Sequence, residues 1–212
     1  FLNAGAHIQH HYLHNAKIER ISETKNPSWY VDPTSDPFLE VIREYDKILG
    51  MLLDDNRKTL IVTGLSQEPY EQTKLYWRLT SHRDFLKDIN VSFKDVRPRM
   101  TRDFEVYFES DASKQKCEEI LGKIVDENGQ KVFGDFQSGE KSLFASLLYP
   151  KDVKGRQFFL EDKSIDFSKY VSFVALKNGK HSAEGFWYYS GLENALAPKK
   201  IDYIWDFFNQ LI

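Results

Sequence analysis

The chain has 212 residues, enough for one sizeable hydrophobic core and a small inserted unit. Hydrophobic residues make up 41% of it and aromatic residues 15%, which is typical of a globular protein and excludes a disordered one. The net charge is −3 and no apolar run approaches the roughly 20 residues of a membrane span, so we expect no nucleic-acid and no membrane partner. The single cysteine, Cys117, excludes an internal disulfide and a CxxC-type metal site.

The first half of the chain is predicted to alternate helices with strands. A strand end at 1–6 leads into a helix at 7–20, and a proline-containing loop separates this helix from a second one at 38–55. The segment "KTLIVTG", residues 58–64, is a short apolar run of the kind found in buried parallel strands. The segment 69–89 is predicted to form another helix that begins near its proline.

The second half is predicted to begin with a small α+β unit at residues 97–160. It contains the alternating strand "FEVYFES", an amphipathic helix at 111–125 with Asp111 as N-cap, and the short strands "KVFG" and "SLFASLLYP". Two strands, "YVSFVALK" and "GFWYYSG", and a closing helix at 200–212 are expected after it. This order predicts an α/β fold with a mostly parallel sheet flanked by helices, formed by residues 1–96 and 161–212, into which the α+β cap at 97–160 is inserted.

Four histidines crowd the N-terminal segment "AHIQHHYLHN": His7, His10, His11 and His14. On a helix, His7, His11 and His14 share a face and His10 lies beside it. Two histidines four residues apart can bind Zn²⁺ through ring nitrogens at about 2.0–2.1 Å. The same pattern is also typical of a polar helix end whose side chains bind backbone groups or water. Both interpretations stay open, because a metal site needs a third ligand from elsewhere in the chain.

Four segments in a fixed order resemble the C-terminal half of the alkaline phosphatase superfamily, in particular its type I phosphodiesterase/nucleotide pyrophosphatase branch. Asn3 and His7 match an Asp-x-x-x-His motif, and "DPTSDPFLEVIREYDKILGMLL" matches a loop and helix with a buried aspartate, at Asp46. "TGLSQ" ends an apolar strand where the family has Ser-Asp-His-Gly. "NGKHSAEGFWYYSG" matches a histidine followed by a strand between glycines, with His181 as that histidine.

The resemblance implies an alkaline phosphatase-like fold and a metal site. Family members use two metal ions, usually Zn²⁺, beside a serine or threonine nucleophile. One ion would be held by Asn3, His7 and His181, although Asn3 replaces a charged aspartate. The second site has Gly64 and Leu65 in place of an aspartate and a histidine, so the sequence predicts at most one zinc ion, weakly bound. Substitute ligands for the second site would have to come from Ser66, Gln67, His10 or His11.

The functional expectation follows from this resemblance. It is a metal-dependent hydrolase-like protein that acts on a phosphoester, phosphodiester or sulfate ester, as part of a longer chain. Its expected partners are a small anionic ester, as substrate or ligand, and a missing N-terminal half that would carry the nucleophile. No catalytic residue and no substrate-binding residue is assigned. The alternative is a catalytically degenerate family member that serves as an anion-binding or protein-interaction module.

Three further groups of residues admit two interpretations each. Arg97, Arg99 and Arg102 can bind phosphate or sulfate through paired hydrogen bonds, or belong to a solvated loop. An aromatic set either lines a sugar pocket or packs in the core, and the alternation favours a half-buried strand; its members are Trp187, Tyr188, Tyr189 and Trp205. The triplet Thr80-Ser81-His82 either suggests nucleophilic chemistry or lies on the surface of a helix, and the absence of a positioned acid favours the surface.

Overall fold

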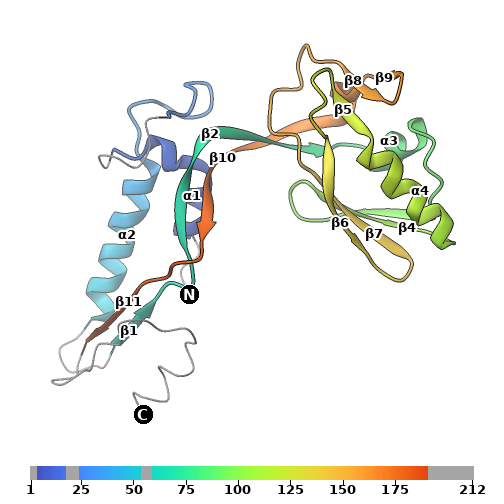
Figure 1. Cartoon of the computed structure of the whole chain (residues 1–212). Coiled ribbons are helices and arrows are strands. Elements are labelled where there is room, and N and C mark those ends of the chain that lie inside the picture. Colours follow the sequence, from blue (N-terminus) through green and yellow to red (C-terminus); the bar gives the residue numbers. More distant parts are fainter. Residues whose placement is uncertain (1–3, 18–23, 54–58, 191–212) are drawn as a thin grey trace. The chain divides into compact units, whose positions relative to one another are not determined.

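The computed structural model describes residues 4–17, 24–53 and 59–190 of the chain (Figure 1). The chain divides into two compact units. The first consists of residues 1–41 and 67–180, and the second of residues 42–66 and 181–212. Within the described residues, no helix is long and apolar enough to cross a membrane.

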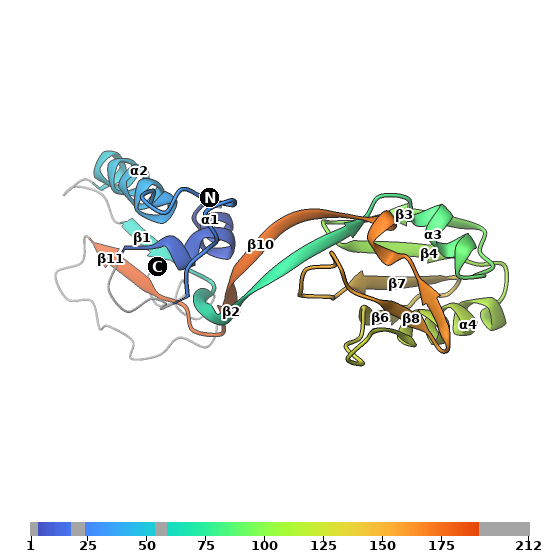
Figure 2. The ribbon, with the colours of Figure 1, turned by 90° about the horizontal axis from the view of Figure 1, so that it is seen from above.

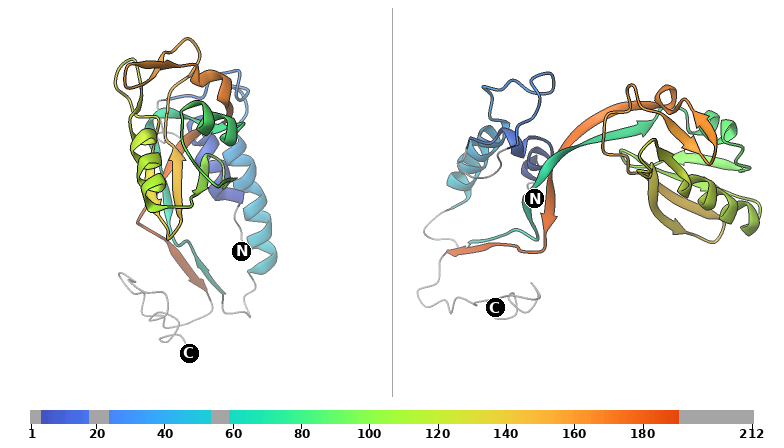
Figure 3. Two further views of the ribbon diagram at one scale, coloured as in Figure 1. Left: turned by 90° about the vertical axis from the view of Figure 1, so that its right-hand side faces the viewer. Right: turned by 45° about the horizontal axis from the view of Figure 1, so that its top comes forward.

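The first unit contains three small sheets. The largest has four antiparallel strands in the order β3 (Asp95–Pro98), β4 (Asp103–Tyr107), β7 (Ser142–Leu147) and β6 (Phe133–Ser138). A second has three antiparallel strands, β5 (Ile124–Asp126), β8 (Phe158–Leu160) and β9 (Lys163–Ile165). The third is a long ribbon of β2 (Ser66–Leu79) and β10 (Val171–Ser182), of which residues 67–79 and 171–180 belong to this unit. The two strands run side by side in the right-hand panel of Figure 3.

Short helices accompany these sheets, as Figure 2 shows for the first unit. They are α1 (Ala4–Tyr12), η1 (Leu13–Asn15), α3 (His82–Asp88), α4 (Asp111–Gly122) and η2 (Phe167–Tyr170). The hydroxyl of Ser110 accepts a hydrogen bond from the Ser113 amide and caps α4, whose Cys117 and Leu121 are buried. A longer helix, α2 (Pro37–Leu52), begins after Asp36, whose carboxylate accepts hydrogen bonds from the amides of Leu39 and Lys17 at 2.9 and 2.8 Å.

The core of the first unit is built mainly from aromatic side chains. Phe104 from β4 and Phe133 from β6 are 0% and 1% exposed and meet edge to face, with ring centres 5.9 Å apart. Phe85 from α3 and Phe167 from η2 pack against Phe133 in the same cluster. Because alternate residues of a strand point to the same face, β4 and β7 each present one apolar row to this core.

The second unit contains an antiparallel pair of short strands, β1 (Thr59–Val62) and β11 (Trp187–Ser190). Thr63 extends the pairing, because its amide donates to the Phe186 carbonyl and its hydroxyl accepts from the Phe186 amide, both at 2.8 Å. A Cβ atom at Gly185 would lie 2.4 Å from the Thr63 carbonyl oxygen, so this close approach of the two chains requires glycine. Among these residues Phe186 remains 64% exposed.

The predicted α/β fold with a mostly parallel sheet is wrong. All sheets in the described part of the chain are antiparallel. A parallel connection needs a crossover of about a dozen residues or more, whereas residues 99–102, 139–141 and 161–162 join neighbouring antiparallel strands by tight turns. The apolar run at 58–64 accordingly forms β1 of an antiparallel pair and not a buried parallel strand.

The helix predicted at 69–89 is wrong in its first half. Residues up to Leu79 form the long strand β2, and only the short helix α3 follows. Pairing with β10 satisfies the backbone of this segment, and its threonine, tyrosine and tryptophan side chains suit a strand.

Several elements in the second half are confirmed, namely β4, α4, β7, β10 and β11. The N-cap of α4 is Ser110 and not Asp111. The helix predicted at 200–212 lies outside the described residues. The domain boundaries at 97 and 160 stay a prediction, although the aromatic core described above also includes Trp77 and Tyr170.

Candidate functional site: a histidine-bearing helix on β10

Helix α1 is attached to β10 through two imidazole rings. Nδ1 of His10 lies 3.1 Å from the Gly179 carbonyl oxygen, and Nδ1 of His11 lies 2.6 Å from that of Leu176. A carbonyl oxygen can only accept, so in both rings Nδ1 carries the proton. In a neutral ring the lone pair is then on Nε2, which is the arrangement that second-shell carbonyls impose on metal-binding histidines.

The surroundings of His11 favour its neutral form. Burial is the largest cause that lowers its pKa below the ordinary value of 6.5, and electrostatic interactions with Lys177 and His7 act in the same direction. The hydrogen bond to the Leu176 carbonyl opposes this shift without cancelling it. A neutral imidazole keeps the Nε2 lone pair that a metal ion or a proton donor requires.

His10 is engaged at both nitrogens. Its Nε2 lies 3.2 Å from Nε2 of Gln67, so the Gln67 amide donates to the ring. The helix approaches the strand closely at this point: a Cβ atom at Gly179 would lie 2.9 Å from the Gln9 carbonyl oxygen. Glycine at position 179 therefore lets α1 pack onto β10 and brings His10 and Gln67 together.

His14 has a structural role. Its side chain is fully buried, with Nδ1 2.9 Å from the Thr73 hydroxyl and Nε2 3.0 Å from the Tyr70 carbonyl oxygen. The carbonyl accepts from Nε2, so the hydroxyl donates to Nδ1. Burial lowers the pKa of His14 as well. With both nitrogens bound to β2, His14 pins the N-terminal segment to this strand and offers no lone pair to a metal.

A pair of buried asparagines continues this attachment. Asn26 and Asn178 donate to each other through their amide groups, both at 2.8 Å. The Asn178 oxygen also accepts from the His14 amide at 3.1 Å, and Asn26 donates to the His11 carbonyl at 3.1 Å. The network joins η1, β10 and the segment around Asn26, and so fixes the orientation of the histidine-bearing helix.

The described residues do not test the three predicted metal ligands. Asn3 lies outside them, His7 is exposed on α1 in the first unit, and His181 is exposed in the second unit. The proposed set of Asn3, His7 and His181 therefore stays a prediction. Within the described residues, no group of three or more His, Cys, Asp or Glu side chains is arranged to hold a metal ion.

The other residues implied by the resemblance are solvent-exposed. Gly64 and Leu65 are exposed between β1 and β2, with no ligating group on either side chain. Asp46 is exposed on α2, whereas the resemblance implies a buried aspartate. Gly64 and Leu65 therefore supply no side-chain ligand for the second metal site.

The three arginines of "RPRMTR" have different environments. Arg97 pairs with Asp95 at 3.3 Å, and Arg99 binds Glu105 and Tyr107. Arg102 instead lies over the Tyr76 ring, with its guanidinium carbon 4.4 Å from the ring centre. Two of the three are thus committed to carboxylates on neighbouring strands, and sequence alone does not distinguish the third.

The remaining sequence candidates belong to packing. Trp187 and Tyr189 are half-buried and Tyr188 is 52% exposed, which fits the expected half-buried strand, while Trp205 lies outside the described residues. The surface position predicted for His82 is wrong, because its ring is buried against Phe104 with ring centres 5.3 Å apart. Its neighbours in sequence misled the prediction, since they form the exposed start of α3.

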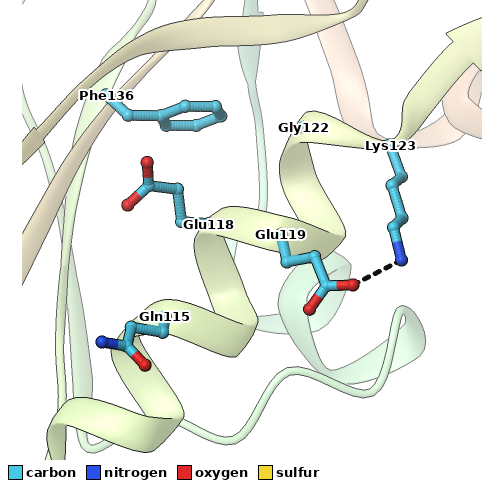
Figure 4. A pocket seen from close by; sticks show the side chains of 6 residues that line it. All are labelled: Gln115, Glu118, Glu119, Gly122, Lys123 and Phe136. Carbon is cyan, nitrogen blue, oxygen red and sulfur yellow. Dashed lines mark hydrogen bonds and ion pairs between the residues drawn. The ribbon is translucent and has the colours of Figure 1, made fainter.

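One open pocket of 450 Å³ lies beside α4 (Figure 4). It is lined by Gln115, Glu118, Glu119, Gly122, Lys123 and Phe136. The ammonium group of Lys123 is held by Glu119 and by Glu161 at 3.0 Å, so its charge is neutralised within the protein. The pocket brings together no nucleophile and base, and we assign no function to it.

Comparison with known proteins gave no match: no family model, no curated protein and no solved structure is similar to this chain. The family resemblance therefore depends on the sequence motifs alone.

Proposed function

We propose that this protein is a metal-dependent hydrolase-like protein acting on a phosphoester, phosphodiester or sulfate ester, and that α1 is its metal-binding element. The observation that carries the proposal is the ring of His11, whose Nδ1 is fixed by the Leu176 carbonyl at 2.6 Å. Its Nε2 has no hydrogen-bond partner among the described residues. His7 lies four residues earlier, on the same face of the helix.

The donors present fit a zinc site in part. Imidazole nitrogen is a common zinc ligand, and two histidines four apart on a helix can bind one ion. His7 and His11 would supply this pair, and His181 and Asn3 are the further ligands that the family resemblance implies. A bound zinc ion would polarise the ester oxygen and lower the pKa of a coordinated water molecule.

Neighbouring residues fix the orientation, the tautomer and the charge state that His11 would need to bind such an ion. The Leu176 carbonyl orients the His11 ring and selects the tautomer, and burial keeps that ring neutral. The lowered pKa of His11 means that protons compete less with the metal at mildly acidic pH. The buried pair of Asn26 and Asn178 holds α1 in place and limits the reorganisation required on binding.

The test is zinc binding by the purified protein, measured by titration calorimetry and by elemental analysis. We expect one zinc ion per chain, lost in His11→Ala and in His181→Ala, and retained in the control Gln9→Ala on the same helix. Hydrolysis of bis(p-nitrophenyl) phosphate and p-nitrophenyl sulfate should depend on the added zinc. Failure of the wild-type protein to bind zinc at micromolar concentration would contradict the proposal.

A second candidate function is an anion-binding or protein-interaction module without catalysis. The exposed Gly64 and Leu65 favour it, because a two-metal mechanism lacks two ligands there. Binding of an oxyanion by a protein that binds no zinc and turns over no ester would select this candidate over the first.

A further inference from the structure

Two cationic side chains converge on one tyrosine ring in the first unit. The guanidinium of Arg102, just before β4, lies 4.4 Å from the centre of the Tyr76 ring on β2. The ammonium of Lys177, on the paired strand β10, lies 5.7 Å from the same ring centre. The face of an aromatic ring attracts cations, so Tyr76 stabilises the two positive charges in a defined place.

These two charges lack anionic partners within the described part of the chain. Neither the guanidinium of Arg102 nor the ammonium of Lys177 forms an ion pair or a side-chain hydrogen bond there, in contrast to Arg97 and Arg99. The carboxylates of Asp103 and Asp135 act electrostatically on the Tyr76 ring, and that of Asp103 also accepts a hydrogen bond from the Ser146 hydroxyl at 2.8 Å. Arg102 and Lys177 are therefore not ion-paired, although two carboxylates act on the same tyrosine ring.

This arrangement disfavours the charged form of Lys177. Burial, and then the positive charge of Arg102, lower the pKa of the Lys177 ammonium to about 8. No carboxylate of the described residues acts on Lys177 in the opposite direction. A bound anion would relieve the repulsion between the two cations and return the pKa of Lys177 toward its ordinary value of 10.5.

We propose that Tyr76, Arg102 and Lys177 form a binding site for a tetrahedral oxyanion of the phosphate or sulfate class. Arginine offers a planar pair of donors that matches two oxygens of such an anion, and lysine adds a compact charge. The tyrosine ring orders both cations before binding, which reduces the entropy lost when the anion binds. The anion would contact no metal and none of the α1 histidines, so phosphate binding is tested separately from zinc binding, although Lys177 also acts electrostatically on His11.

The chain offers a matched control for this site. Lys74, also on β2, lies 4.1 Å from the centre of the Tyr70 ring and makes the same kind of cation–π contact, and no other cation of the described residues lies over that ring. Lys74→Gln removes one positive charge and one such contact, as Lys177→Gln does. Any difference between these two variants therefore reports the convergence of two cations and not the loss of one charge.

The experiment is a calorimetric titration of the whole chain with inorganic phosphate, with sulfate and with phenyl phosphate. Charged hydrogen bonds contribute about 1.5–3 kcal/mol, so Arg102→Gln and Lys177→Gln should each weaken phosphate binding by about tenfold or more. Lys74→Gln and Tyr76→Phe should change it by less than about twofold, and Tyr76→Leu, which removes the ring, should weaken it clearly. Tighter binding of phenyl phosphate than of inorganic phosphate would identify an ester group as the ligand, and the reverse order would identify the free ion.

A second measurement keeps the proposal testable if a variant folds poorly. The pKa of Lys177 in the wild-type protein, followed by NMR of the side-chain methylene next to the ammonium, should rise when phosphate is added. An unchanged pKa, or equal weakening by Lys74→Gln and Lys177→Gln, would overturn the proposal. Addition of a chelator should leave phosphate binding unchanged, so failure of the zinc site and failure of this site give different results.

Discussion

The core of the first unit and the β1–β11 pair of the second contain similar residues in opposite environments. Phe104 and Phe133 are at most 1% exposed, whereas Phe186 is 64% exposed and Tyr188 52%. Four strands packed with α3 and α4 enclose their own aromatic core. Two strands of four residues each have too little surface to bury their apolar side chains, since an isolated pair of strands is marginal in water.

The difference shows that apolar composition alone does not define a core. Exposed apolar side chains in a cluster usually mark a surface that another segment or partner covers. Val62 and Leu65 are also 41% and 51% exposed in the second unit. The N-terminal half predicted from the sequence would be one such cover, and that partner stays a prediction.

The largest loss of stability is expected for a substitution in the aromatic core. Phe104→Ala should lower the free energy of unfolding by about 3–5 kcal/mol, because it removes a fully buried ring and leaves a cavity. Urea unfolding followed by circular dichroism measures this loss. A loss below about 1 kcal/mol would show that the core is loosely packed and that the contrast between the two regions is weaker than described.

The next effect is a dependence of stability on pH. Burial, and then the positive charge of Arg78, lower the pKa of His82 to about 4 from 6.5. Between these values the unfolded chain binds a proton that the folded protein does not, so the free energy of unfolding falls as the pH drops from 6.5 to 4. The stability lost through His82 between pH 6.5 and pH 4 is about 3 kcal/mol at most, and none of it is lost above pH 6.5.

Unfolding measured between pH 7 and pH 4 in the wild-type protein and in His82→Gln tests this prediction. The variant should lose stability less steeply than the wild type over this range. The free energy of unfolding of the variant should still fall somewhat as the pH drops, because the pKa values of His11 and His14 are also lowered. Identical slopes for the two proteins would show that His82 is protonated in the folded state.

A smaller effect is expected in the polar network that holds α1. Asn178→Ala removes both bonds to Asn26 and leaves the buried His14 amide without its acceptor. The expected loss is about 1–3 kcal/mol. A double-mutant cycle with Asn26→Ala measures the coupling, and the exposed Asn128→Ala serves as control. Additive losses would indicate that water replaces the amide pair.

The smallest effect is expected in the β1–β11 pair. Phe186→Ser and Val62→Thr should each change the free energy of unfolding by less than about 0.5 kcal/mol, because the two residues are 64% and 41% exposed. Their unfolding curves should match the wild type when the protein is dilute. A large loss in either variant would show that a further segment or a second molecule covers this pair in solution.

Local patterns were sufficient to predict part of the fold. The amphipathic helix α4 and the strands β4 and β7 each show their pattern within a few neighbouring residues, and all three were predicted, although the two strands pair across about forty residues. The strand β2 was missed because its signal is weak. Only Trp77, Arg78 and Leu79 alternate clearly between buried and exposed. The remainder of β2 is defined by pairing with β10, about a hundred residues later in the sequence.

The candidate site was predicted only in outline. The sequence showed that four histidines crowd one short segment, but not which of them retain a lone pair. His14 is committed to Tyr70 and Thr73, which lie 56 and 59 positions away, and His11 to the carbonyl of Leu176. Such partners cannot be deduced from spacing, because they depend on how α1 packs on two distant strands.

The sequence by itself determined that the protein is globular, that these 212 residues form no internal disulfide, and where its strongly periodic elements lie. These properties follow from composition and from repeats of 2.0 or 3.6 residues, which act within a few positions of each residue. Only the tertiary structure decided the direction of the strands and the convergence of Arg102 and Lys177 on Tyr76. Both depend on backbone pairing between distant segments, and a short apolar run such as "TLIV" is equally compatible with a parallel or an antiparallel neighbour.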